Sequence, residues 1–222
     1  LFEEVKRVGG ITIPHTTASN MGNDWRFNDP DVEVNVEVFQ GDRYSYEYEE
    51  APLAPKLTYD KPNMDTPKEN GYVWNALEKG YWLGITASSD HLSTHVSYAN
   101  VWATENTREA ILDAYRARRT YGATDDIVLD YRMDGHWMGE RFAAESMPAA
   151  AVHVIGTGPI EEIVVIRDGE FVHRVAGTGE SEAQFEWTDP DPRSGRHYYY
   201  VRVQQTDGNM AWASPIWVTL PG

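Results

Sequence analysis

The second half of the chain is a series of short β-forming runs separated by turn signals. The runs lie at residues 127–132, 150–156, 160–167, 170–175, 184–187, 197–205 and 211–218. Asp-Gly pairs at 134–135, 168–169 and 207–208 are typical of tight hairpin turns. Seven short strands of this spacing are the pattern of a β-sandwich. We therefore predict an all-β sandwich for residues 124–222.

The first half has a different rhythm, in which expected strands and helices alternate. We expect strands at 11–13, 32–39, 83–87 and 98–103, and helices at 70–79 and after Asn106, which is followed by Glu109 as in a capping box. The alternation stops near residue 123. We therefore predict a domain boundary there, with an α/β domain over 1–123 followed by the all-β domain over 124–222.

Three of the expected strands end in side chains that bind metals or move protons. In chain order these candidates are His15, Glu37, Asp90, His91 and His95. Each also has an ordinary interpretation: the alternation around Glu37 fits a half-exposed strand with solvated carboxylates, and the Asp-His pair fits a polar turn. In an α/β barrel, however, the carboxyl ends of all strands face one side, where these side chains would converge.

Imidazole together with carboxylate is the ligand set of a catalytic Zn, Mn or Fe site that keeps positions open for water. Such a metal lowers the pKa of its bound water and so generates a hydroxide nucleophile. The chain has no cysteine, so thiolate ligands and disulfides are excluded. A Ser-His-Asp triad from Ser88 or Ser89 with His91 and Asp90 is disfavoured, because these residues are adjacent and no nucleophile-elbow glycines surround either serine.

Charge and hydropathy narrow the class of partner. The net charge of −16 disfavours a nucleic-acid partner, since that backbone is bound by clustered Lys and Arg. No apolar run approaches the roughly 20 residues of a membrane span, so no membrane partner is expected. The compartment is left open. The first ten residues have no initiator Met and place Leu1, Val5 and Val8 at helical spacing before two glycines, which we interpret as the end of a helix whose start is missing.

Three stretches together resemble a known family. They are Ile-Thr-Ala-Ser-Ser-Asp-His-Leu-Ser-Thr-His at 85–95, Ile-Pro-His-Thr-Thr at 13–17 and Val-Glu-Val-Phe-Gln-Gly at 36–41. They resemble motifs of the PHP-domain metallohydrolases (the polymerase and histidinol phosphatase superfamily), and in particular the DUF3604 branch related to CehA/McbA-type hydrolases. Residues 107–114, 118–124 and 211–217 are also similar to that branch.

The resemblance implies a partial PHP-type distorted β/α barrel with a divalent metal site (Zn, Mn or Fe), followed by a β-sandwich. It implies hydrolysis of a small-molecule phosphoester or related ester, with His15, Asp90 and His91 as metal ligands. Glu37 and His95 would serve as catalytic groups, Glu37 as a ligand or water-orienting base and His95 as a substitute for His91.

The chain departs from the family pattern in two respects. The family's opening His-x-His motif is absent, and Asp90 and His91 are adjacent where most relatives have Asp-x-His. We therefore expect the chain to be the C-terminal half of a longer protein, with an incomplete site of its own. It would associate with the missing N-terminal half or with a second copy.

A rival hypothesis places the function in the sandwich, as a non-catalytic structural or interaction module. The chain has 8 Trp and 13 Tyr, and a group of them comes late: Tyr198, Tyr199, Tyr200, Trp212 and Trp217. These rings would stack on a glycan or bury a protein interface, or they would simply pack the core.

Other polar and aromatic groups carry the same ambiguity. The alternating tyrosines at 44, 46 and 48 would form a binding wall or pack down the long connection at 42–70. The arginines at 116, 118 and 119 would clamp an anion or complement a helix end. The scattered histidines at 136, 153, 173 and 197 are interpreted as surface or sheet residues.

Overall fold

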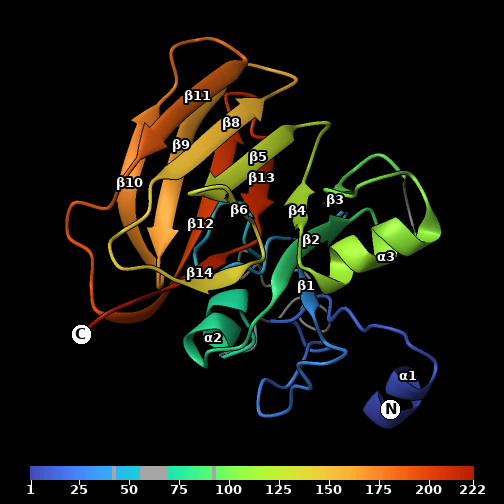
Figure 1. Cartoon of the computed structure of the whole chain (residues 1–222). Helices are drawn as coiled ribbons and strands as arrows, with labels where there is room; N and C mark the ends of the chain where they lie inside the picture. The colour runs from blue at the N-terminus through green and yellow to red at the C-terminus, as the bar shows by residue number, and fades with distance from the viewer. Residues whose placement is uncertain (42–43, 56–69, 92–93) are drawn as a thin grey trace.

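The computed structural model describes residues 1–41, 44–55, 70–91 and 94–222, and β-strands dominate it (Figure 1). The helices of this part are short: α1 (Phe2–Arg7), α2 (Val73–Glu78) and α3 (Arg108–Arg116). Its strands are β1 (Asn35–Gln40), β2 (Gly84–Ser88), β3 (Tyr98–Val101), β4 (Thr120–Ala123), β5 (Val128–Met133), β6 (His136–Trp137), β7 (Arg141–Ala143), β8 (Ala150–Ile155), β9 (Ile160–Arg167), β10 (Glu170–Ala176), β11 (Glu182–Trp187), β12 (Gly195–Gln205), β13 (Met210–Ala213) and β14 (Ile216–Leu220). No helix in the described ranges is long and apolar enough to span a membrane.

Two sheets form the predicted β-sandwich, which is confirmed. The large sheet has the order β10-β9-β12-β13-β4-β3, with β14 pairing with both β12 and β7. The small sheet has the order β11-β8-β5-β6 and lies over the large sheet (Figure 1). Between them lies an apolar core to which alternate residues of each sheet contribute, such as Leu129 and Val154 from the small sheet and Val165 and Val201 from the large one.

The central strands of the large sheet, β9, β12, β13 and β14, are buried on both of their faces. In β12, Tyr199 and Val201 point into the core between the sheets, whereas Tyr198 and Tyr200 belong to a second core on the opposite face. That second core is completed by β1, β2 and α2, which lie against the large sheet below the sandwich (Figure 1). Burial on both faces explains the continuous apolar and aromatic runs at residues 163–166 of β9 and 198–201 of β12, a pattern otherwise typical of parallel sheets.

The first half does not form the predicted partial PHP-type β/α barrel, so the α/β fold class is wrong for this half. β1 and β2 form a separate two-stranded parallel sheet, whereas β3 and β4 are antiparallel and join the large sheet through β13. No closed barrel occurs within the described ranges. The alternation of strands and helices misled the prediction, because it does not reveal which neighbour each strand pairs with. The domain boundary near residue 123 stays a prediction, and the large sheet draws strands from both sides of it.

The strand at β1 is buried along its whole length, which corrects the interpretation of a half-exposed strand with solvated carboxylates. One face packs into the second core through Val36 and Val38. The other face carries Asn35 and Glu37, which are buried among polar partners of the polypeptide. Asn35 donates to the Tyr115 carbonyl at 2.8 Å and accepts from the Thr120 hydroxyl at 2.9 Å.

Three of the observed elements differ from those predicted from the sequence. The expected strand at 211–218 is two strands, β13 and β14, interrupted at Ser214 and Pro215, where the proline has no N–H for a ladder. The helix after Asn106 is capped by Thr107, whose hydroxyl accepts from the Ala110 N–H. The expected strand at 11–13 is a single bridge between Thr12 and Glu33. Residues 42–43 and 56–69 of the long connection expected at 42–70 lie outside the described residues.

Candidate functional site

The carboxyl ends of β1 and β2 gather polar side chains in one place. The parallel register sets Gln40 beside Ser88 and Glu37 beside Thr86. The segment that carries His15 runs along β1, since the Glu37 N–H donates to the Pro14 carbonyl at 3.0 Å. We call His15, Glu37, Gln40, Ser88 and Asp90 the strand-end cluster.

Hydrogen bonds connect the cluster in pairs. The Ser88 hydroxyl donates to a Glu37 carboxylate oxygen. The Nδ1 atom of His15 lies 3.4 Å from the Gln40 amide nitrogen and 3.3 Å from the Thr16 hydroxyl. Gln40 is buried, and its Oε1 has no hydrogen-bond partner among the described residues. The cluster therefore has a buried polar base, and the exposed His15 ring lies at its rim.

The loop after β2 carries the remaining candidates. Asp90 has a left-handed backbone (φ 59°), and its Oδ1 accepts from the His91 N–H at 2.6 Å and lies 2.6 Å from His91 Nδ1. His95 is exposed, with Nδ1 2.6 Å from the Thr94 hydroxyl. The Ser89 hydroxyl accepts from the Val96 and Ser97 N–H groups and so closes this loop on itself.

The cluster does not form a complete metal site. Within the described ranges, no three His, Asp or Glu side chains are arranged so that they could hold one ion. His15 and Asp90 each direct a polar atom at a group of the protein instead. The predicted ligand set His15, Asp90 and His91 and the catalytic groups Glu37 and His95 therefore stay a prediction. The disfavoured triad has no support either, because Ser88 is bound to Glu37 and Ser89 to backbone groups.

A buried carboxylate that the sequence did not single out lies in the second core. Glu47 is fully buried and accepts from the Tyr200 hydroxyl at 2.5 Å, from Arg202 Nη1 at 2.9 Å and from Trp212 Nε1 at 3.0 Å. Trp74 of α2 donates to the same Tyr200 hydroxyl at 2.6 Å. We call Glu47, Tyr200, Arg202, Trp212 and Trp74 the Glu47 network; it ties the segment before α2 to the large sheet.

The late aromatic side chains are core residues. Tyr198, Tyr199, Tyr200, Trp212 and Trp217 are each at most 5% exposed, so they are not available to stack on a glycan in this conformation. Tyr46 is likewise buried. Packing, the ordinary interpretation, is confirmed for the late aromatic residues and for Tyr46, whereas Tyr44 and Tyr48 are half-buried.

The arginines after α3 have individual structural roles. Arg118 is only 3% exposed and donates to the carbonyls of Trp82, Arg116 and Pro30. Burial, with the nearby Arg141 charge, lowers the pKa of Arg118 to about 10. Arg119 pairs with Glu140 at 3.2 Å. Neither the anion clamp nor the solvated helix end describes Arg118, which instead holds three separate backbone segments together.

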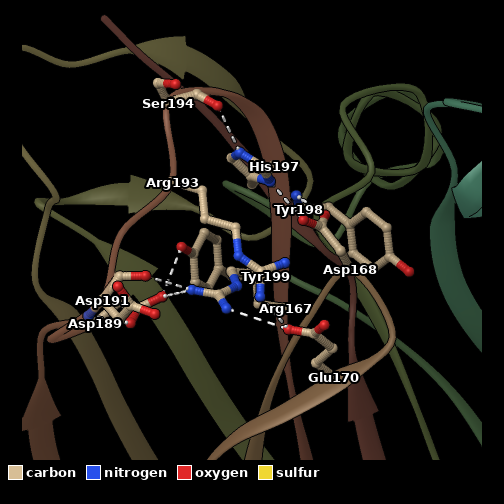
Figure 2. A network of polar contacts seen from close by, with 10 residues as sticks. All are labelled: Arg167, Asp168, Glu170, Asp189, Asp191, Arg193, Ser194, His197, Tyr198 and Tyr199. Atoms are coloured by element: carbon tan, nitrogen blue, oxygen red, sulfur yellow. Dashed lines mark hydrogen bonds and ion pairs between the residues drawn. The ribbon is translucent and has the colours of Figure 1, made fainter. Parts of the chain in front are cut away.

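A second polar network lies at the β9–β10 turn (Figure 2). The buried Arg167 guanidinium donates to Asp189 at 2.6 Å and to Glu170 at 3.2 Å, and the Tyr199 hydroxyl donates to the same Asp189 at 2.9 Å. The guanidinium groups of Arg167 and Arg193 hold the pKa of Glu170 below its usual range. We call Arg167 and the four side chains around it the Arg167 network; the four are Glu170, Asp189, Arg193 and Tyr199.

Comparison with known sequences supports part of the family resemblance. The family described as "Protein of unknown function (DUF3604)" matches residues 56–153. Uncharacterized proteins of Chlamydia pneumoniae and Chlamydia trachomatis are 28% and 27% identical over 95% of this chain. The chain spans 38% of the length of these curated relatives. The DUF3604 resemblance is thus confirmed for residues 56–153, and the metallohydrolase part of it stays a prediction.

Solved structures give only weak matches. The fibronectin(III)-like modules of Clostridium thermocellum CbhA align at a TM-score of 0.31 and 14% identity, over 41% of this chain and 94% of that one. The CARDB domain of the PF1109 protein from Pyrococcus furiosus aligns at 0.28 and 13%, over 43% and 93%. Matches this weak do not assign a fold or a function to this chain. We identify the β-sandwich from the observed strand pairing alone.

Proposed function

We propose that the β-sandwich is a non-catalytic structural module that holds the β1–β2 layer, and with it the strand-end cluster, in a fixed position. The observation that supports this most directly is that the large sheet buries its second face against β1, β2 and α2. A face so covered is not available for another partner. The sandwich would then serve the longer protein as a platform, which also fits the 38% of the relatives that the chain spans.

The Glu47 network supports the same proposal. A buried ion pair bonded on all sides fixes one arrangement of the groups around it, because any shift leaves a charge unpaired in a dry interior. Here the pair joins Glu47, on the segment before α2, to Arg202 on β12. A buried ion pair of this kind is expected in a fixed structural contact rather than in a surface that binds and releases partners.

Native-state hydrogen exchange of the intact chain tests this proposal. Trp212→Ala removes a fully buried side chain from the large sheet. If the sandwich is a platform, the slow amides of β1 and β2 lose protection together with those of β12 and β13. As a control, Val128→Ala changes an exposed side chain of the small sheet and should leave the β1–β2 amides unchanged. If β1 and β2 keep full protection in Trp212→Ala, the two parts are independent and the proposal fails.

A second candidate function is favoured by the strand-end cluster itself. We propose that the chain supplies part of the site of a metal-dependent hydrolase of phosphoesters or related esters, the remainder coming from outside the described residues. The convergence of His15 with Gln40 and of Glu37 with Ser88 at parallel strand ends supports this, since such ends are where sites are commonly built. The proposed partners are a small ester and the rest of the longer protein.

Metal analysis after extensive desalting, without added metal, tests the second candidate. Stoichiometric Zn, Mn or Fe that is lost in His15→Ala and Asp90→Ala would support it. His153→Ala is the matched control, because this partly exposed imidazole lies on the sandwich and pairs with Glu182 at 2.8 Å. Metal that is retained in both site variants, or lost equally in the control, would contradict the assigned ligands. Loss in the site variants alone would leave the structural role of the sandwich untouched.

A further inference from the structure

β11 is an edge strand of the small sheet and lies at the margin of the sandwich (Figure 1). Within the described ranges it pairs with β8 alone, so one of its sides has no neighbouring strand. An open edge presents unpaired N–H and C=O groups to any chain that can adopt an extended conformation. The open side of β11 is therefore a surface that another strand could join.

The other edge strands of the sandwich are poorer templates. The pairing of β10 is irregular between Phe171 and His173. β3, β7 and β6 are only four, three and two residues long. Bulges and short strands are common ways in which proteins protect their edges. β11 has six residues in unbroken register with β8, so it is the longest regular edge among the described strands of the sandwich.

Every second residue of β11 turns its backbone groups to the open side. The Gly156 N–H donates to the Ser181 carbonyl at 2.7 Å. Because bonded and non-bonded pairs alternate in an antiparallel ladder, the next residue, Glu182, belongs to a non-bonded pair, and so do Gln184 and Glu186. The N–H and C=O groups of these three residues therefore point away from β8. None of them bonds to another backbone group in the described part of the chain.

The inward side chains of β11 are apolar. Ala183, Phe185 and Trp187 are partly buried and pack against the core between the two sheets. His173 of β10 stacks on Trp187, with ring centroids 5.1 Å apart. A strand added beside β11 would continue the small sheet, and its own inward side chains would lie next to Phe185 and Trp187. This side favours apolar residues at alternate positions of the added strand.

The outward side chains of β11 are acidic or neutral. Glu182, Gln184 and Glu186 are exposed, and the strand contains no Lys or Arg. If the β11 strands of two copies paired antiparallel about Gln184, each Glu182 would lie opposite a Glu186, and like charges directly opposite are destabilising. The net charge of −16 adds to this repulsion. The edge therefore disfavours a second copy and favours a strand with cationic side chains.

We propose that the open edge of β11 binds an extended segment of a partner protein in which basic and apolar residues alternate. Main-chain hydrogen bonds to β11 supply the affinity, and the alternating side chains supply the specificity. The inference goes beyond both proposed functions, because it uses neither the β1–β2 layer nor the strand-end cluster.

NMR titration of the intact chain with the blocked hexapeptide Lys-Val-Lys-Val-Lys-Val tests the inference. Saturable shifts are expected at the amides of β11. The peptide Lys-Lys-Lys-Val-Val-Val has the same charge and composition but does not alternate, so it should bind about tenfold more weakly. Equal affinity for the two peptides would mean general attraction to an acidic protein and would overturn the inference. Saturable shifts that leave the β11 amides unchanged would overturn it as well.

Variants of β11 separate the backbone contribution from the charge contribution. Gln184→Pro removes an N–H that points away from β8, so it blocks strand addition while the ladder to β8 is kept, and the affinity should fall by about tenfold or more. The matched control, Gln184→Ala, keeps that N–H and should bind as the unaltered protein does. Equal affinity in the folded proline and alanine variants would overturn the inference.

The charge contribution can be measured even if the proline variant does not fold. Glu182→Gln and Glu186→Gln change exposed side chains, and each should weaken binding by about two- to fivefold. Unchanged affinity in both would overturn the choice of a basic partner. Light scattering without peptide tests the remaining occupant, since a dimer with protected β11 amides would overturn the inference in favour of a second copy.

Discussion

Replacing Glu47 by alanine should destabilise the protein by about 3–5 kcal/mol, the range measured when one partner of a buried ion pair is removed. The carboxylate is 0% exposed and accepts three hydrogen bonds, from Tyr200, Arg202 and Trp212. Summing about 1.5–3 kcal/mol for each of the three bonds to this charged group gives about 4.5–9 kcal/mol, which is an upper bound because bonds within one network are not additive. The loss would still be a large fraction of the roughly 5–15 kcal/mol that stabilises a typical domain.

The origin of the loss can be separated with two further variants. Burial lowers the pKa of Arg202, and the Glu47 carboxylate, together with Tyr48 and Tyr200, raises it above its usual value. Because a guanidinium is not deprotonated in proteins, Arg202 stays charged when Glu47 is removed, and its charge is then unpaired. The double variant Glu47→Met with Arg202→Met removes both charges but also the acceptor of the Tyr200 hydroxyl and the Trp212 N–H. It should therefore be more stable than Glu47→Ala and less stable than the unaltered protein. Glu47→Gln keeps the side chain's shape and one acceptor, so its effect should be smaller than that of alanine.

Urea unfolding followed by circular dichroism measures these differences. The single variants Glu47→Met and Arg202→Met, together with the double variant and the unaltered protein, form a cycle that isolates the pairwise coupling. The denaturant slope should stay constant, which shows that the same surface unfolds in each case. The reasoning would be refuted if Glu47→Ala lowered the free energy of unfolding by less than about 1 kcal/mol, the value typical of an exposed pair. It would also be refuted if the double methionine variant were as unstable as the single alanine variant.

Three further predictions concern other contacts. Gly122→Ala should destabilise the protein by about 1–3 kcal/mol in the same assay, because an added Cβ would lie 2.9 Å from the backbone of β2; an unchanged midpoint would show that β2 can shift. Trp212→Ala should cost about 3–5 kcal/mol of unfolding free energy, as for other fully buried tryptophans, and a loss under 1 kcal/mol would contradict its place in the core. Arg167 and Arg193 lower the pKa of Glu170, so this carboxylate contributes stability that is present above its unfolded pKa and is lost as the pH falls through its lower folded pKa. Glu170→Gln should therefore flatten the fall in melting temperature on acidification, and an identical acid profile would exclude the contribution.

The sandwich could be predicted from the sequence because its signals are local. The alternation and turn residues located β9 at residues 160–167, as observed, and the other strands of the sandwich to within two residues at most boundaries. Where the prediction joined β13 and β14 into one strand, Pro215 was the available signal. The run Tyr198, Tyr199, Tyr200 also indicated burial on both faces, but we interpreted it as rings that bind a glycan or a protein or pack one core, whereas it contributes to two cores.

The arrangement of the first half could not be predicted, because its pairing is decided by distant contacts. β3 and β4 resemble strands of an α/β unit, but β4 pairs with β13, almost ninety residues later in the chain. Glu47 has ordinary acidic neighbours, and nothing near it indicates Arg202 as a partner 155 residues away. At the strand ends, the pattern placed His15 after an expected strand at 11–13, which is a single bridge, and it missed Gln40 and its contact with His15.

The double burial of the large sheet has a consequence for how this protein tolerates change over evolution. Successive residues of β12 pack into two different cores. A substitution at an odd-numbered position must fit the core between the two sheets, and one at an even-numbered position must fit the second core beside β1, β2 and α2. In a strand with one solvent-facing side, every second residue can be substituted with little effect on stability. In β12, residues 198–203 are all buried, so almost no position there is of this kind. Across relatives, this strand should therefore accumulate substitutions more slowly than β11, whose residues alternate between partial and full exposure.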